Sequence, residues 1–239
     1  MNANQQNIDK EEISKFNELA SRWWDTDGDF KPLHEINPLR LDYICRQSNL
    51  KDLKIVDIGC GGGILSEAMA KKGGIVTGID MAEKAIAVAK LHQIESKTTV
   101  DYKLMTAEEL AEDEAGSFDI VTCLEMLEHV PDPSKVIQSC ADLLKPGGSV
   151  YFSTINKNLK SFLFAIIGAE HILKLLPVGT HEYSKFIKPS SMESWSRQSL
   201  LELQSSIGLE YNPFISKYSL THNLDVNYMM HFMKPNEET

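Results

Sequence analysis

The fold of this 239-residue chain is decided by Lys54-Ile55-Val56-Asp57-Ile58-Gly59-Cys60-Gly61-Gly62-Gly63. The apolar part of this stretch is short and rich in β-branched residues, which is typical of a parallel strand buried on both faces. The glycines that follow permit positive φ and let a ligand approach the backbone closely. Helix-forming residues begin at Ile64, so a strand, a glycine turn and a helix occur in the order of a nucleotide site.

Details of the turn narrow the choice of nucleotide. A dinucleotide fingerprint needs a third glycine at the place held by Ile64, and the phosphate-loop pattern Gly-Lys-Ser/Thr is absent. Instead, Asp57 precedes the first glycine and Asp80 closes the next apolar run, where an acid can bind ribose hydroxyls. An acid beside the glycines favours a sulfonium ligand over a diphosphate. The stretch thus resembles the S-adenosylmethionine (SAM) site of class I methyltransferases; the alternative is a turn needed only for strand-to-helix packing.

Apolar runs and helix-forming segments alternate through the middle of the chain. We expect strands at 54–58, 75–79, 100–104, 118–124 and 149–154, helices at 65–72, 83–93, 107–111 and 133–144, and a turn at 145–148. A helix at 191–207 and two antiparallel strands at 209–217 and 226–233 follow. This order predicts an α/β, doubly wound, seven-stranded and mainly parallel sheet, with ligands outside the carboxyl ends of the strands.

Two segments depart from that rhythm. Asp9 can cap a helix with Glu12 three places on, in the pattern of a capping box. Residues 24–40 are too irregular for one element and, before a short helix at 39–46, form part of an N-terminal lid spanning 1–48. Residues 157–190 form an insertion after the fifth strand, placed to cover the active site. We expect one domain over residues 1–239.

Composition limits the class of protein. The net charge of −10 argues against non-specific nucleic-acid binding, which depends on clustered Lys and Arg. The four cysteines form no CxxC pair, and the first residues show no charged and apolar signal region. We therefore expect a cytoplasmic protein with free thiols and no nucleic-acid partner.

Two acids and a histidine follow the fourth expected strand. Glu125, Glu128 and His129 would lie beside the bound cofactor, and on a turn of helix Glu125 would share a face with the other two. Such a group can hold a hard divalent cation or supply a base for a phenolic hydroxyl. It can also merely order the loop, because many class I methyltransferases carry a similar Leu-Glu-His-Val without a metal.

More specific segments are spread over nearly the whole chain: Trp23-Trp24-Asp25, Phe30-Lys31-Pro32-Leu33-His34, Ile36-Asn37-Pro38-Leu39-Arg40, Gly59-Cys60-Gly61-Gly62-Gly63-Ile64-Leu65, Glu125-Met126-Leu127-Glu128-His129-Val130-Pro131-Asp132-Pro133, Gly179-Thr180-His181, Lys185-Phe186-Ile187-Lys188-Pro189 and Asp225-Val226-Asn227-Tyr228. Together they resemble the ubiquinone-biosynthesis O-methyltransferase family. The resemblance implies that SAM is contacted by Arg40 at its carboxylate, by the Gly59 backbone, by Asp80 at the ribose and by Leu124.

The remaining expected site residues complete this set. Asp57, Gly61 and Met81 join the expected cofactor contacts, because Asp57 lies just before the glycine turn, Gly61 lies in it and Met81 follows Asp80. The family's metal-linked residues would fall on Glu125, Glu128 and His129, with Mg²⁺ as the expected ion. A divalent cation bridging two catechol oxygens would lower the pKa of the phenol and fix the angle of attack.

The resemblance implies transfer of the SAM methyl group to a catechol oxygen of polyprenylated intermediates, namely 2-polyprenyl-6-hydroxyphenol and 3-demethylubiquinol. Two other functions stay open: methylation of another small molecule, and a non-catalytic SAM-binding scaffold subunit. A nucleic-acid methyltransferase would carry Asn/Asp-Pro-Pro-Tyr/Phe after the fourth strand, where Leu124-Glu125-Met126-Leu127 stands. Other proteins of ubiquinone biosynthesis are further expected partners.

The insertion predicts a contact with a membrane surface. On a helical wheel of residues 159–176 the apolar side chains share a broad arc, with lysines on the other side. Residues 157–188 hold five lysines against two glutamates, a local net charge of +3 in a chain of −10. We expect this segment to bind anionic headgroups and to place the enzyme peripherally at the inner membrane. The alternative is a lid that packs only on the active site.

Overall fold

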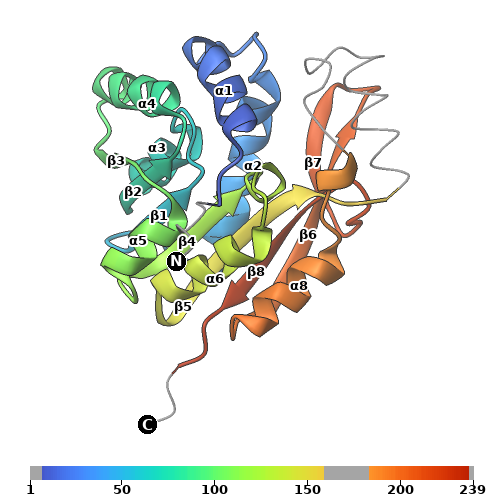
Figure 1. Cartoon of the computed structure of the whole chain (residues 1–239). Coiled ribbons are helices and arrows are strands. Elements are labelled where there is room, and N and C mark those ends of the chain that lie inside the picture. Colours follow the sequence, from blue (N-terminus) through green and yellow to red (C-terminus); the bar gives the residue numbers. More distant parts are fainter. Residues whose placement is uncertain (1–6, 159–182, 237–239) are drawn as a thin grey trace.

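The computed structural model describes residues 7–158 and 183–236, which form a sheet covered by helices on both faces (Figure 1). The strands are β1 (Lys54–Ile58), β2 (Ile75–Asp80), β3 (Val100–Leu104), β4 (Phe118–Leu124), β5 (Leu144–Ile155), β6 (Glu202–Asn212), β7 (Lys217–Thr221) and β8 (Asn227–Met233). The helices are α1 (Lys10–Leu19), α2 (Lys31–Gln47), α3 (Ile64–Lys71), α4 (Glu83–Ser96), α5 (Ala107–Glu114), α6 (Pro133–Leu143) and α8 (Pro189–Gln198), with 3-10 turns η1 (Ala20–Arg22), η2 (Leu127–His129) and η4 (Tyr183–Lys185).

The strand order is β3-β2-β1-β4-β5-β8-β6-β7. Strands β1 to β5 run parallel, and β8, β6 and β7 add antiparallel neighbours at the β5 side. The predicted doubly wound α/β fold with a mainly parallel sheet is confirmed. The direction in which strands are added reverses between β1 and β4, which is where doubly wound sheets open a crevice for ligands.

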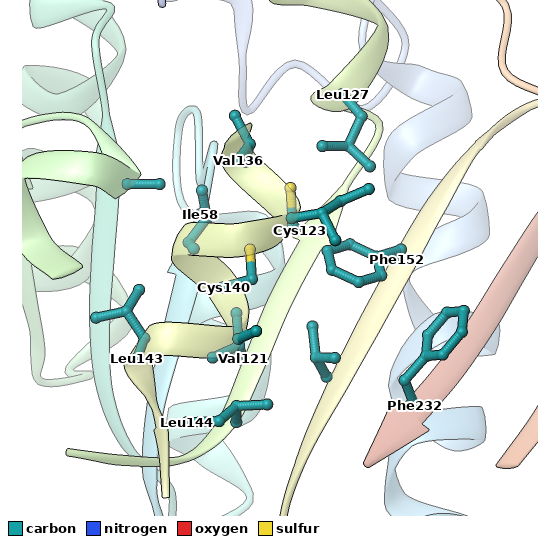
Figure 2. Packing of buried hydrophobic residues seen from close by; sticks show 14 of the residues in the cluster. Ile58, Val121, Cys123, Leu127, Val136, Cys140, Leu143, Leu144, Phe152 and Phe232 are labelled. Carbon is teal, nitrogen blue, oxygen red and sulfur yellow. The ribbon is translucent and has the colours of Figure 1, made fainter. Parts of the chain in front are cut away.

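Two apolar clusters fix the layers. Val56 and Ile58 of β1 pack into one cluster with α5, α6 and α8, whereas Ile55 packs into the other with α2, α3 and α4. These side chains are at most 1% exposed, because successive residues of a strand point to opposite faces and both faces are covered. Figure 2 shows the first cluster, in which side chains of β4, β5 and β8 meet those of α6.

The sheet has eight strands among the described residues, so the expectation of seven was wrong. The additional strand is β7, which pairs with β6 at the sheet edge. The helix expected at 191–207 was also wrong beyond α8: that helix ends at Gln198, Leu200 has a φ of +59°, and β6 begins at Glu202. No glycine or proline marks the break, so the usual stop signal of a helix is missing there.

The region expected to be irregular at 24–40 is helical from Lys31 onward, as the start of α2. Pro32 lies in the first turn, where its missing N–H costs nothing. Pro38 lies inside the helix and leaves the His34 carbonyl without its usual helical donor. The expectation of an irregular segment was therefore wrong from Lys31 onward, where α2 continues through both prolines into the region of the expected helix at 39–46.

The insertion predicted to dock on a membrane lies largely outside the described residues, because 159–182 are not described. Within the described ranges no helix has the length and apolar character needed to cross a bilayer.

Helix α1 lies next to α4 at the top of Figure 1.

Candidate active site

A cavity of about 1140 Å³ lies at the carboxyl ends of β1, β2 and β4 and is also lined by α1 and α2. A volume of this size can hold more than one small ligand. It brings together nine of the ten residues predicted from the sequence: Arg40, Asp57, Gly59, Asp80, Met81, Leu124, Glu125, Glu128 and His129. Gly61 is the exception.

Gly61 is separated from the cavity by the indole of Trp23. Its φ of +53° suits glycine, and a Cβ added there would overlap the Trp23 ring. Gly59, with a φ of +71°, has Met126 in the corresponding place. The Trp23 ring in turn stacks on Phe30, with ring centroids 4.1 Å apart. The glycines thus allow aromatic side chains of the N-terminal region to seat directly on the turn.

The two acids of the cofactor end have different partners. Asp80 accepts the Gly61 N–H at 2.8 Å on one oxygen and the Ala82 N–H at 2.7 Å on the other. Burial raises the pKa of Asp80, while the backbone hydrogen bonds oppose the rise. Because a carboxylate has about four acceptor positions, each oxygen of Asp80 can still accept a ligand hydroxyl.

Asp57 is 3% exposed and is held by two hydroxyls. Ser66 donates to one of its oxygens at 2.6 Å and Thr122 donates to the other at 2.7 Å. Burial raises the pKa of Asp57 to about 6, although these two hydrogen bonds favour the charged form. The hydrogen bonds from Ser66 and Thr122 thus hold the end of β1 in place just before the glycine turn.

Arg40 and Glu125 form the centre of the cavity wall. Arg40 is 6% exposed, and its Nη2 donates to Glu125 Oε1 at 2.5 Å. Ser153 Oγ and Asn227 Nδ2 donate to the same oxygen at 2.7 and 3.0 Å. Glu125 has a φ of +54°, which a non-glycine residue adopts at a cost of about 1 kcal/mol or more. Donors from α2, β5 and β8 thus hold the carboxylate of Glu125, whose backbone is strained.

The backbone corrects one prediction about this motif. The 3-10 turn η2 contains Glu128 and His129 but not Glu125, whose left-handed conformation precedes it. The three side chains therefore do not share one face of a helical turn.

Glu128 is 4% exposed, and its Oε2 has no hydrogen-bond partner among the described residues. Burial, followed by the negative charge of Glu125, raises the pKa of Glu128 to about 7. A carboxyl group with that pKa exchanges its proton readily near neutral pH.

His129 is oriented by a residue far away in the sequence. Its Nδ1 lies 2.9 Å from Oε2 of Glu12, and the other oxygen of Glu12 accepts hydrogen bonds from Lys185 and Lys15, each at 3.0 Å. Burial alone would lower the pKa of His129, but the bond to Glu12 and the nearby carboxylates raise it. The bond from His129 in turn holds the pKa of Glu12 well below its usual range.

Sequence analysis missed how this end of the cavity is supported. Glu12 was expected to complete a capping box, but Asp9 alone accepts the N–H groups of Glu11 and Glu12, and the Glu12 side chain turns inward. Asn227 and Lys185 lay within recognised segments, which was their only signal. Ser153 carried no sequence signal for its contact.

The predicted metal ligands do not fit a cation as they are placed. Among residues 7–158 and 183–236, no three His, Cys, Asp or Glu side chains are grouped for a metal. Glu125 already has the Arg40 cation at 2.5 Å, and Nδ1 of His129 contacts Glu12. A hard divalent cation prefers several oxygen ligands around it. Among the described residues, Oε2 of Glu128 is the one carboxylate oxygen of this group that is buried without a hydrogen-bond partner.

Comparisons with known proteins identify the family of this chain. A family model described as a methyltransferase domain matches residues 56–152. The ubiquinone biosynthesis O-methyltransferase of Hahella chejuensis is 57% identical, with 96% of this chain and 97% of that protein covered. The protein of the same name from Pseudomonas aeruginosa is 59% identical, with 94% and 97% covered. A solved magnesium protoporphyrin IX methyltransferase from Synechocystis with bound SAH has a TM-score of 0.71, 19% identity, and coverage of 95% and 100%.

The fold, the glycine turn and the matching family model make this protein a class I SAM-dependent methyltransferase. Identity near 60% over almost the whole length narrows the assignment. The chain belongs to the ubiquinone biosynthesis O-methyltransferases, as its sequence segments indicated.

Proposed function

We propose that this enzyme transfers a methyl group from SAM to a catechol oxygen of polyprenylated intermediates in ubiquinone biosynthesis, 2-polyprenyl-6-hydroxyphenol and 3-demethylubiquinol. The names of its relatives support O-methylation in that pathway. The observation that carries the proposal is one cavity that joins Asp80 to the buried Glu128. Cofactor and acceptor can meet there without crossing solvent.

At the cofactor end, SAM supplies an activated methyl group when it is bound. The residues proposed to contact it are Arg40, Gly59, Asp80, Met81 and Leu124, whereas Asp57 and Gly61 are proposed to shape the turn that holds it. Asp80 would accept ribose hydroxyls while its bonds to Gly61 and Ala82 hold it in place. Asp57 acts indirectly by bracing the turn, and Arg40 offers positive charge at the middle of the cavity.

At the transfer end, Glu128 is the proposed base for the phenolic proton. Its unpartnered Oε2 and its pKa of about 7 suit proton transfer near neutral pH. Arg40 forms an ion pair with the neighbouring Glu125. Glu125 can therefore stay charged while Glu128 accepts the phenolic proton. Because the methyl group is already activated, the other contribution of the enzyme to the rate of methyl transfer is to position the acceptor oxygen.

The family resemblance implies Mg²⁺ on Glu125, Glu128 and His129, but the proton transfer to Glu128 does not depend on it. The present side-chain contacts suit proton transfer better than ligation of a hard cation. Turnover in excess chelator tests this choice: full activity supports the metal-independent route, and loss that added Mg²⁺ restores supports ligation after rearrangement.

The N-terminal residues 1–48 are proposed to act as a lid over the cofactor, since Trp23 and residues of α1 and α2 line or cover the cavity. The basic segment 157–188 is proposed to dock on the inner membrane from the cytoplasmic side. Co-sedimentation with anionic liposomes of the parent and of a Phe162→Glu, Ile166→Glu pair tests that segment. Equal sedimentation of both proteins would favour a purely covering role.

The decisive experiment is mass-spectrometric detection of a methylated catechol after incubation with SAM and a short-tail analogue. No product, with SAM bound normally, would favour the scaffold alternative. Product from unrelated soluble acids or amines, but not from the catechol, would favour another small-molecule methyltransferase.

The cofactor site has its own test in Asp80→Ala. Removal of a charge-assisted bond to a ribose hydroxyl should weaken SAM binding by about tenfold to a hundredfold without loss of the fold. Calorimetry with the parent affinity would reject the assigned site.

A further inference from the structure

The loop between β6 and β7 presents two large apolar side chains to solvent. Phe214 is 94% exposed, the highest value among the large hydrophobic residues described, and its neighbour Ile215 is 62% exposed. They lie in the turn at 213–216, at the tip of the β6–β7 hairpin. These two adjacent side chains bury little area in the fold, and exposed apolar patches of this kind mark interaction sites.

The backbone holds this tip in a defined shape. The Phe214 N–H donates to the side chain of Asn212 at 3.0 Å, and Ser216 turns the chain with a φ of +50°. These features are typical of a tight turn stabilised by an Asx bond. The two apolar side chains are therefore presented by an ordered loop between paired strands.

The segment that forms the tip carries no acidic side chain, which suits a lipid surface. Residues 211–222 contain Lys217 and neither Asp nor Glu, although the whole chain has 34 acids and a net charge of −10. An acid-free tip can approach anionic headgroups that the body of the protein repels. Behind the tip, Tyr211 and Tyr218 pack with ring centroids 4.8 Å apart, and Tyr is a residue that favours the membrane interface.

The tip is continuous with the active-site cavity. Tyr211, Pro213, Phe214 and Tyr218 all line it, together with the residues of the cofactor and transfer ends. The cavity therefore extends as far as the tip that carries the two apolar side chains.

We propose that the β6–β7 hairpin tip inserts Phe214 and Ile215 into the headgroup region of a phospholipid membrane and sets the cavity mouth against the bilayer. The purpose of this contact rests on the proposed function, because a polyprenylated acceptor resides in the bilayer. Strand β7, which was not among the seven strands expected from the sequence, then forms one side of the docking tip.

The main test compares vesicle binding of three full-length proteins: the parent, a Phe214→Glu, Ile215→Glu pair, and a Leu91→Glu, Ile94→Glu pair. Leu91 and Ile94 are 68% and 73% exposed on α4, so they match the tip in exposure but not in position. The tip pair should bind vesicles of phosphatidylcholine and phosphatidylglycerol at least about tenfold more weakly, and the α4 pair should bind like the parent. Circular dichroism and SAM affinity check that each variant is folded.

A second measurement reports insertion directly. Tryptophan fluorescence of Ile215→Trp, after subtraction of the parent signal, should be quenched by vesicles of brominated lipid, whereas Leu91→Trp should not be. Parental vesicle binding by the tip pair, or an unquenched Ile215→Trp, would overturn the inference. So would self-association of the parent in sedimentation velocity that the tip pair abolishes, because a second copy would then be the partner. None of these readouts needs turnover, so they stand apart from the methyl-transfer assay.

Discussion

The two ends of the cavity are built by contacts of very different range. At the cofactor end, Asp80 reaches Gly61 across 19 residues and Ser66 reaches Asp57 across 9. At the transfer end, Glu125 is held by Arg40 from 85 residues away and by Asn227 from 102. Asp57 also receives Thr122 from the neighbouring strand, but the glycine turn itself is a local structure.

The two ends of the cavity therefore need different parts of the chain to be folded. One β-α-β unit supplies the glycine turn and both acids of the cofactor end, to which Arg40 and Leu124 are added from α2 and β4. The transfer end exists only when α1, α2, β5, β8 and η4 have all docked around η2, because each donates or accepts a hydrogen bond there. Substitutions should therefore be able to disable methyl transfer while SAM binding survives.

Glu128→Gln is expected to have the largest effect and to separate the two ends most clearly. The amide cannot accept the phenolic proton, so turnover should fall by about a hundredfold to ten-thousandfold. SAM affinity should stay close to that of the parent, since the change is confined to the transfer end. Turnover comes from methylated product and affinity from calorimetry.

Glu83→Gln is the matched control, because Glu83 is exposed at the start of α4 and outside the cavity lining. It should leave both quantities unchanged. An equal loss of turnover and SAM affinity in Glu128→Gln would mean that Glu128 acts through the cofactor end.

The next largest effect is expected from Gly61→Ala, compared with Gly116→Ala. Both glycines have positive φ, +53° and +63°, but a Cβ at Gly61 would meet the Trp23 ring whereas one at Gly116 has nothing within 4 Å. Gly116→Ala should cost only backbone strain, about 1 kcal/mol of unfolding free energy. Gly61→Ala should also displace Trp23 and lower SAM affinity by about tenfold to a hundredfold. Equal effects of both changes would show that Trp23 does not matter to the turn.

The range of contacts also explains what the sequence could predict. Strands β1, β3 and β4 were predicted to the residue. Strands β1 and β4 are mostly apolar because both faces of the sheet are covered there, whereas the edge strand β3 alternates apolar and charged residues. The start of β6 was missed because the chain turns at Leu200, where nothing local favours positive φ. Glu12 was misassigned because a capping pattern is local, whereas its partner His129 lies 117 residues away.

Two buried groups, His231 outside the cavity and Asp57 at its cofactor end, should give opposite pH dependences of stability. Burial lowers the pKa of His231 in β8 to about 4, and His231 is stacked on Tyr151 with its Nδ1 unpartnered among the described residues. Between about pH 6.5 and pH 4 the unfolded chain binds a proton that native His231 does not, so stability falls as pH falls. His231→Phe should remove on the order of 2 kcal/mol of that acid loss.

Asp57 works in the other direction, because its native pKa of about 6 lies above the ordinary value of 3.8. Between about pH 6 and pH 3.8 the native state binds the extra proton, so Asp57→Asn should lose more stability on acidification than the parent. Urea unfolding at several pH values measures both slopes, with His222→Phe as the control at an exposed histidine. If His231→Phe kept the parental slope, the buried imidazole would not be the source.

Glu12→Gln should have the smallest effect, and it tests whether the transfer end depends on its most distant support. The amide oxygen of the new side chain could still accept the bond from Nδ1 of His129, but the charge that attracts Lys185, 173 residues away, would be lost. Lys185 and Lys15 are 29% and 50% exposed and can turn to water, so the loss of unfolding free energy should be about 1 kcal/mol. Turnover should fall by about twofold to tenfold through a less firmly held His129. SAM affinity should not change. Glu11→Gln, in the same turn but exposed, is the control. A double-mutant cycle with His129→Ala completes the test: if Glu12 acts through His129, Glu12→Gln should change turnover little once the imidazole is gone. Additive effects, or a Glu11→Gln variant as slow as Glu12→Gln, would show that Glu12 only stabilises α1.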